Sequence, residues 1–450
     1  MMLPRPSQVG PGVLRTRVGL NVLLFFALCI LARGWSAENV SLPDPYPRIT
    51  SKKGLQVEMV DDAIALGVRH AALNLDLARL IDLEGGPNSI AFESEGRTFH
   101  FRRDYVEAND RRVKSLSDAG MVVTLILLNY QNSSDALNRI TLHPHYDPAC
   151  PNHLSAFNTE TPEGRVHFQS CLEFIAGRYA RGDRQFGRVW NYIVGNEVNS
   201  HWFWCNMGRV TMEQFADDYL RAVRLCVTAV KKYSAHARVF VSLEHHWNIR
   251  YPGGDARQSF PARAFLEYFA SQARAGGDFD WNIAFHPYPE NLFNPRTWLD
   301  KSATTNQDTP RITFKNLELL PGFLRQPAFL FAGRPRHIIL SEQGFHMAED
   351  SDGELFQAAA YCYAYYKTDH LAGIDAFIYH RHVDNAHEGG LNLGLWRRGA
   401  GAGDNLPSLK KRLYDVFQHA DQPDWEPHFA FALPVIGIAN WKEILPPAVK

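Results

Sequence analysis

The chain has 450 residues, of which 45% are hydrophobic and 21% are charged, as is typical of a globular protein with a substantial core. Its formal net charge of −1 argues against nucleic acid as a partner, because phosphate binding needs a basic surface. Aromatic residues make up 12% of the chain and include ten Trp. These rings suit core packing and sugar binding equally, so composition does not separate the two uses.

The N-terminus has the pattern of an export signal. Arg15 and Arg17 precede an apolar run from Val18 to Ala32, and small residues follow that run. We therefore expect residues 1–37 to be a secretory signal peptide or an uncleaved N-terminal anchor. The protein is then expected to be secreted, periplasmic or attached to the cell surface. No other integral membrane segment is expected.

Residues 38–450 alternate between short apolar runs and longer helical periods, which predicts strands alternating with helices. The Gly-rich loop that usually follows the first strand of an open doubly wound sheet is absent. We therefore expect one α/β catalytic domain, a (β/α)8 TIM barrel with a small β-hairpin insertion at 90–101 and long rim loops at 130–161 and 292–336. The eight expected strands are 53–56, 70–75, 121–128, 189–194, 239–243, 281–285, 337–340 and 374–379. Expected helices include 60–66, 211–230, 317–324, 355–368 and 409–417.

Five cysteines follow the signal segment, so at least one thiol is expected to stay free or to pair between chains. Cys171 and Cys226 fall on the apolar faces of expected helices and are interpreted as small core residues. Cys150 and Cys205 lie in expected loops and could form a disulfide. The sequence leaves that pairing open.

Polar side chains stand where three expected barrel strands end. Asn196-Glu197 follows the fourth strand, His286-Pro287-Tyr288 follows the sixth, and Glu342 follows the seventh. In a closed barrel the carboxyl ends of these strands meet at one face, where active sites lie. A carboxylate placed directly after a buried strand is partly desolvated, so it must be paired or functional.

Two carboxyl groups facing each other across a barrel mouth suit retaining glycoside hydrolysis. That reaction needs the groups about 5–5.5 Å apart, one protonated and one ionised. Burial and a neighbouring carboxylate both raise the pKa of the group that must donate a proton. The pattern therefore predicts Glu197 and Glu342 as the catalytic pair.

The motifs on strands four, six and seven resemble the retaining glycoside hydrolases of clan A, the four/seven barrel superfamily. This resemblance implies that Glu197 is the acid/base, Glu342 the nucleophile and Asn196 a partner of the sugar 2-hydroxyl. It further implies that Tyr288 donates to Glu342 and that His286 lines the same subsite. The likeness is incomplete, because strand eight ends in Tyr-His-Arg where the clan often has Trp, and strand two lacks its Arg. An uncharacterised bacterial branch of the clan is therefore expected.

Other residues near the expected barrel mouth are weaker candidates for substrate binding. Trp202 and Trp204 follow Glu197 in a loop that would overhang the cleft, where they could stack on a sugar or simply bury each other. Asn129, His246 and Arg381 fall just past strand ends without a spacing argument behind them.

Two alternatives remain beside the glycoside hydrolase hypothesis. Histidines just past several strand ends could hold zinc in a metal-dependent hydrolase, although no His-Glu-x-x-His motif occurs. The barrel could also bind carbohydrate without catalysis. The primary hypothesis needs no cofactor and no metal, and its partner is a carbohydrate substrate.

Overall fold

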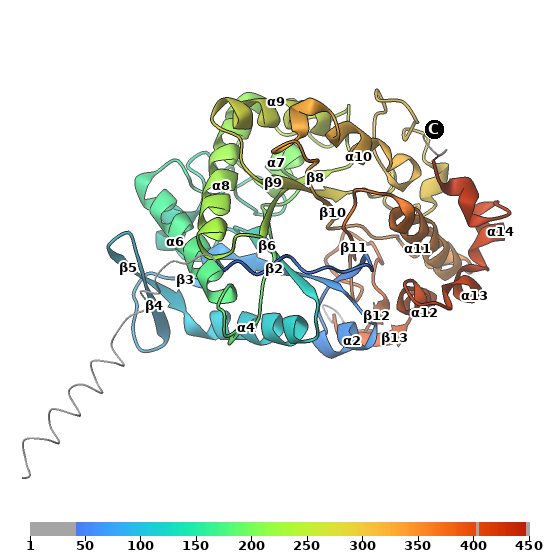
Figure 1. Cartoon of the computed structure of the whole chain (residues 1–450), viewed down its shortest axis with the longest axis horizontal. Helices are drawn as coiled ribbons and strands as arrows, with labels where there is room; N and C mark the ends of the chain where they lie inside the picture. Colours follow the sequence, from blue (N-terminus) through green and yellow to red (C-terminus); the bar gives the residue numbers. More distant parts are fainter. Residues whose placement is uncertain (1–41, 402–404, 447–450) are drawn as a thin grey trace, which may run out of the picture.

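The computed structural model describes residues 42–401 and 405–446, so the expected signal segment at 1–37 lies outside the described residues. Eight parallel strands close into a barrel in the order β1-β11-β10-β9-β8-β7-β6-β2, with helices around it (Figure 1). This confirms the expected (β/α)8 TIM barrel. The barrel strands are β1 (Lys53–Gln56), β2 (His70–Asp76), β6 (Val122–Leu128), β7 (Asn191–Val194), β8 (Arg238–Glu244), β9 (Trp281–His286), β10 (Ile338–Leu340) and β11 (Ala376–Tyr379).

The barrel strands divide the core into two layers because successive side chains on a strand point to opposite faces. In β6 all seven residues are buried, and Ile126 and Leu128 point into the barrel while Leu125 and Leu127 face the helices. The interior layer is a compact apolar cluster that fills the barrel beneath its carboxyl-terminal mouth. Its members are Ala72, Ile126, Leu128, Leu154, Ile193, Phe240, Ala284, Ile339, Ala376 and Ile378.

The outer layer consists of helices that bury apolar faces on the strands. The longer ones are α4 (Arg103–Asp118), α6 (Pro162–Tyr179), α8 (Met212–Tyr233), α9 (Ala262–Ala275) and α11 (Gly353–His370). Helix α8 begins with a capping box between Thr211 and Gln214. The shorter helices are α2 (Val60–Ala65), α3 (Leu77–Leu80), α5 (Asp135–Thr141), α7 (His201–Trp204), α10 (Leu319–Leu324), α12 (Arg412–His419), α13 (Trp425–Phe429) and α14 (Ala432–Ile436). The 3₁₀ turns are η1 (Val198–Ser200), η2 (Thr297–Leu299), η3 (Phe314–Asn316), η4 (Pro327–Phe329) and η5 (Trp441–Ile444).

The expected hairpin is present as β4 (Ser89–Ser94) and β5 (Arg97–Arg102), joined in a small sheet by β3 (Ile81–Asp82). Glu95 and Gly96 both have positive φ, which suits the tight two-residue turn. Phe101 of the hairpin stacks on Phe174 of α6 with ring centroids 4.1 Å apart.

The expected helix at 409–417 is partly wrong. The segment Pro407–Lys410 forms the strand β13, which pairs with β12 (Trp396–Arg398), and helix α12 begins only at Arg412. Pairing with the nearby strand β12 outweighs the local helical pattern here.

The cysteine interpretation is partly resolved. Cys171 and Cys226 are buried in α6 and α8, as expected of small core residues. Cys150 and Cys205 are not joined, and the thiols of Cys150, Cys171, Cys205, Cys226 and Cys362 are all free. Within residues 42–401 and 405–446, no helix combines the length and apolar character needed to cross a bilayer.

A buried ion pair ties the first barrel strand to the C-terminal part of the chain. Lys53 on β1 is completely buried, and its ammonium group pairs with Asp421 and donates to the carbonyl of Gln418 at 3.0 Å. Asp421 also accepts from the Ser51 hydroxyl at 2.7 Å. Burial lowers the pKa of Lys53, so its charge depends on these partners.

We expect Asp421→Ala to lower the free energy of unfolding by about 3–5 kcal/mol, because it leaves the buried Lys53 ammonium uncompensated. Urea denaturation followed by circular dichroism measures this loss. The matched control is Asp118→Ala, which removes an exposed i,i+4 pair with Lys114 and should change stability by about 0.5 kcal/mol or less. Equal effects of the two variants would contradict the assigned role of the buried pair.

Candidate active site

The carboxyl ends of β7, β9 and β10 bring three ionisable side chains together at the mouth of the barrel. Glu197 follows β7 by three residues, His286 is the last residue of β9, and Glu342 follows β10 by two. One carboxylate oxygen of each glutamate and one ring nitrogen of His286 all lie within 4.8 Å of one another. The two carboxylates therefore meet at one end of the barrel.

Glu197 is held in an unusual backbone conformation directly before η1. Its φ of 40° and ψ of 51° are left-handed, which costs a non-glycine residue about 1–3 kcal/mol. Its backbone N–H donates to the hydroxyl of Ser242 on β8 at 3.0 Å, which fixes this turn. The turn directs the side chain toward His286, whose Nδ1 lies 2.9 Å from Glu197 Oε1.

The Glu197–His286 pair is buried, and the pKa values of both side chains are raised. Burial raises the pKa of Glu197, and the charges of Glu342 and Glu244 add to this effect against the opposing bond from His286. Burial opposes a charge on His286, but Glu342 and Glu197 outweigh it and raise the pKa of the imidazole. Both shifts favour a proton shared within the pair. The other ring nitrogen of His286 lies 3.0 Å from the Ser341 hydroxyl, so the ring cannot turn freely.

Each oxygen of Glu342 accepts one hydrogen bond. The Tyr288 hydroxyl donates to Oε1 at 3.2 Å, and the Gln56 side-chain amide of β1 donates to Oε2 at 3.2 Å. Burial and the charge of Glu342 raise the pKa of Tyr288 well above its ordinary value, so the phenol stays a donor. The two donors fix the orientation of the carboxylate.

A series of hydrogen bonds from Gln56 joins the first barrel strand, β1, to the segment that follows the last one, β11. The amide oxygen of Gln56 lies 2.8 Å from His380 Nδ1, and the other nitrogen of that ring lies 3.2 Å from Glu388. Arg381 pairs with Glu388 at 2.6 Å and with Glu58 at 3.0 Å. The Arg381 guanidinium therefore forms ion pairs with two carboxylates of the protein itself. A cavity of about 200 Å³ opens here, lined by Gln56, Val57, Glu58, Ala72, Asn74, Arg112, His380 and Arg381.

A third buried carboxylate, Glu244, ends β8 and supports the turn that carries Glu197. Asn199 and Ser200 of η1 donate to its Oε1 at 2.6 and 2.9 Å, and the backbone N–H of His246 donates to Oε2 at 2.8 Å. Burial opposes its charge, but the His246 ring at 2.5 Å and the nearby His245 lower the pKa of Glu244 to about 2. His246, which was expected to line a subsite, is buried and pairs with Glu244 through its Nδ1. The Arg311 guanidinium lies 3.3 Å from its Nε2.

The remaining sequence candidates differ in their surroundings. Asn196 precedes Glu197, is partly exposed, and its amide has no hydrogen-bond partner among residues 42–401 and 405–446. Trp204 packs on the apolar cluster inside the barrel, so it borders the mouth. Trp202 donates through its indole to Asp147 at 3.0 Å and meets the Phe203 ring edge to face.

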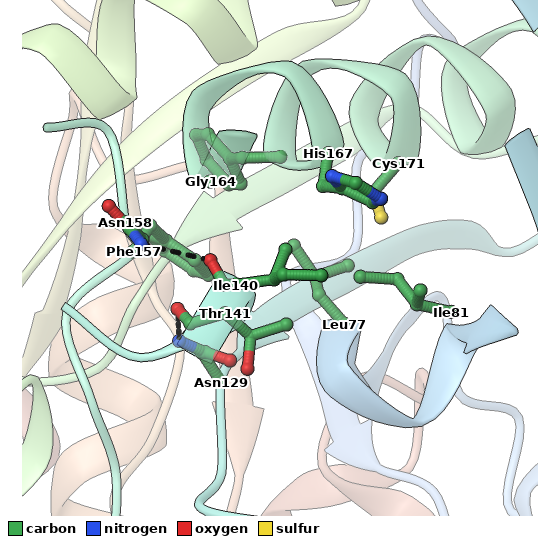
Figure 2. Close-up of a pocket in the computed structure, with 11 residues that line it drawn as sticks. Leu77, Ile81, Asn129, Ile140, Thr141, Phe157, Asn158, Gly164, His167 and Cys171 are labelled. Carbon is green, nitrogen blue, oxygen red and sulfur yellow. Dashed lines mark hydrogen bonds between the residues drawn. The ribbon is translucent and has the colours of Figure 1, made fainter. Parts of the chain in front are cut away.

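Asn129 is turned toward the long loop at 130–161. Its amide donates to the carbonyls of Thr141 at 2.7 Å and Ala156 at 3.2 Å, so it holds the loop in place. Figure 2 shows it beside a cavity of about 20 Å³, enough for roughly one water molecule, between α3, α5 and α6. Its partners are backbone groups of this loop, and none of them belongs to the carboxylate pair.

The sequence interpretation missed Gln56, Ser242, Glu244, Ser341 and Glu388. Glu244 carried the same signal as Glu197 and Glu342, an acidic residue directly after a buried strand. Gln56 also ends a strand, but an amide there has no distinctive pattern. Glu388 lies in a loop, and only the folded chain brings it to His380.

Residues 45–444 match the profile of a family of unknown function, DUF5722, and no curated protein matches the chain. The fold is similar to a family 39 glycoside hydrolase from the gut symbiont Bacteroides cellulosilyticus WH2, with 14% identity, a TM-score of 0.53, and coverage of 84% of this chain and 66% of that chain. The chain thus spans just under two thirds of that structure. The fold is also similar to a β-glucosidase from Pyrococcus furiosus, with 16% identity, a TM-score of 0.52, and coverage of 84% of this chain and 86% of that chain. A family 1 β-glucosidase from Thermotoga maritima is similar with 11% identity, a TM-score of 0.50, and coverage of 80% of this chain and 84% of that chain. These structural matches show a shared fold.

We expect Glu244→Gln to lower the pKa of Glu197, because the charge of Glu244 helps to raise it. Gln keeps an oxygen that can accept from Asn199 and Ser200, so the turn should remain. Titration of ¹³C-labelled glutamate carboxyls by NMR measures the shift. In the control Glu163→Gln, which changes an exposed carboxylate, Glu197 should titrate as in the wild type. An unchanged or higher pKa of Glu197 in Glu244→Gln would refute this coupling.

Proposed function

The chain belongs to the DUF5722 family, and we propose that it is a retaining glycoside hydrolase that cleaves a β-glycosidic bond in an oligo- or polysaccharide. The observation that carries this proposal is the approach of one oxygen of Glu197 to one of Glu342 within 4.8 Å. Retaining enzymes keep their two carboxyl groups about 5–5.5 Å apart, whereas inverting enzymes need about 6.5–9.5 Å to admit water.

The environments of the two carboxylates suit opposite roles. Glu197 is buried with a raised pKa, as a general acid requires, and protonates the glycosidic oxygen as the bond to the leaving group breaks. Glu342 accepts two hydrogen bonds that stabilise negative charge, and it attacks the anomeric carbon. Water, deprotonated by Glu197, then attacks the glycosyl-enzyme ester and restores both groups. The resemblance to clan A, supported at the level of fold by the solved structures, points the same way.

The substrate-binding roles rest on position. Asn196 is free to bind the sugar 2-hydroxyl, an interaction that strengthens in the transition state. Tyr288 and His286 orient the carboxylates and line the same subsite. Trp202 and Trp204 offer partly exposed rings shortly after Glu197 in the chain. The signal-like N-terminus supports a secreted, periplasmic or surface location, where such polymers are met.

A metal-dependent hydrolase is the second candidate, because Glu244, His245 and His246 also place their ligand atoms within 4.8 Å of one another. The same holds for Glu197, His286 and Glu342. Both nitrogens of His286 are already bonded to protein groups, which favours the metal-free mechanism. Loss of activity on dialysis against a chelator, with recovery on adding zinc, would support the metal alternative.

A panel of activated 2-deoxy-2-fluoro-β-glycosides tests the nucleophile. The fluorine slows both steps, and a good leaving group lets the first proceed, so a glycosyl-enzyme should accumulate on Glu342. Peptide mapping by mass spectrometry identifies the labelled residue and the sugar. Glu342→Gln should take up no label. A label on another residue would overturn the assignment, and turnover with no label by a chelator-sensitive enzyme would favour the metal candidate.

The alkaline limb of the pH–rate profile tests Glu197. Activity requires the protonated carboxyl, so the rate should fall as pH rises through the raised pKa of Glu197. Glu197→Ala should lose this limb and slow hydrolysis of unactivated substrates by roughly 10²–10⁴-fold. Added azide, which needs no general base, should form a β-glycosyl azide in this variant. Retention of the limb, or an α-glycosyl azide, would contradict the role.

A further inference from the structure

A second cluster of metal-type side chains lies near the end of the described chain. Asp415 and His419 are four residues apart on α12, and His428 lies on α13. One carboxylate oxygen and one nitrogen of each ring all lie within 4.8 Å of one another. We call these three residues the C-terminal histidine cluster.

The C-terminal histidine cluster is separate from the candidate active site. His419 directly follows Gln418, whose carbonyl accepts from Lys53 at the first residue of β1. The cluster therefore lies toward the amino ends of the barrel strands, whereas Glu197 and Glu342 follow the carboxyl ends. Figure 1 shows α12 and α13 next to each other in the red, C-terminal part of the chain.

The donor atoms are spaced as a small metal ion needs them. His428 Nδ1 lies 2.8 Å from Asp415 Oδ2, and His419 Nδ1 lies 3.6 Å from Asp415 Oδ1. Two ligands at about 2.1 Å from a tetrahedral zinc ion are roughly 3.4 Å apart, so the observed separations lie on either side of that value. The two rings are nearly parallel, with centroids 3.5 Å apart and 6° between their planes. The nitrogen lone pairs lie in the ring planes, so the two rings must turn out of this parallel stack before both face one ion.

The surroundings leave most of these donors available. His419 Nδ1 lies 2.9 Å from the backbone carbonyl of Asp415, so His419 either gives up that hydrogen bond or binds through its other ring nitrogen. In the part of the chain that the structure describes, no lysine or arginine pairs with Asp415, and its ion-pair partners are the two histidines. The Asp415 side chain is 61% exposed, and those of His419 and His428 are 24% and 26% exposed, so an ion can enter from solvent. A water molecule would complete the shell of such an open three-ligand site.

We propose that the C-terminal histidine cluster binds a divalent transition-metal ion such as Zn²⁺. Imidazole and carboxylate ligands suit zinc, nickel and copper better than they suit magnesium or calcium. The ion joins α12 to α13, two short helices separated by a five-residue connection from 420 to 424. The bound ion would stabilise this segment. The proposal is independent of whether the barrel hydrolyses glycosides.

Zinc titration of the chelator-treated full chain by calorimetry tests the site. The wild type should bind one ion at this site, and His428→Ala and Asp415→Asn should each weaken that binding roughly tenfold or more. Cobalt should give visible d–d absorption in the wild type but not in these variants. Zinc should raise the Tm of the wild type by mass action and leave that of the variants nearly unchanged. His236→Ala, an exposed histidine elsewhere on the surface, should behave as the wild type.

Circular dichroism should show that the variants are folded, because Asp415 is exposed and His428 is partly exposed. Zinc binding by His428→Ala and Asp415→Asn with wild-type affinity would overturn the proposal, as would the absence of binding at micromolar zinc. Loss of the bound ion in His245→Ala but not in His428→Ala would assign the metal to the barrel mouth, and the proposal would then be wrong.

Discussion

The hydrogen bond between Glu197 and His286 is the interaction on which the candidate active site depends. It buries a carboxyl group against an imidazole within 4.8 Å of a second carboxylate, so three ionisable groups share one small volume. Such a volume cannot hold two unscreened negative charges at low cost, and a proton kept in the pair relieves the repulsion. The same arrangement gives the two carboxylates different partners, an imidazole for Glu197 and two hydrogen-bond donors for Glu342.

Supporting contacts hold that geometry against its own strain. Glu197 takes a left-handed backbone, and Ser242 fixes its N–H while Glu244 secures Asn199 and Ser200 just beyond it. All of these supports come from β8 or the turn that precedes α7. The neighbouring strand thus positions the side chain that β7 carries, as rigid elements must for a precise site.

The fold and the centre of the site could be predicted from sequence because both follow from local patterns. Buried apolar runs marked the strands, and polar residues after three of them had to meet once the barrel closed. Contacts between distant parts of the chain could not be predicted in this way. Arg381 forms ion pairs with Glu58 and Glu388, and Asn129 donates hydrogen bonds to backbone carbonyls of the loop at 130–161. At 407–410 strand pairing replaced an expected helix, because the partner strand is invisible to a helical pattern.

The link from Gln56 to Glu342 has a consequence for how the protein is made. Gln56 lies on the first barrel strand, and one edge of that strand is covered only by β11, the last. During synthesis this edge therefore stays open until Ala376–Tyr379 has left the ribosome. Exposed strand edges recruit other chains, so the nascent protein passes through an aggregation-prone stage. The orientation of Glu342 is completed only at the final closure, and a chain that ends before β11 would lack the barrel that supports it.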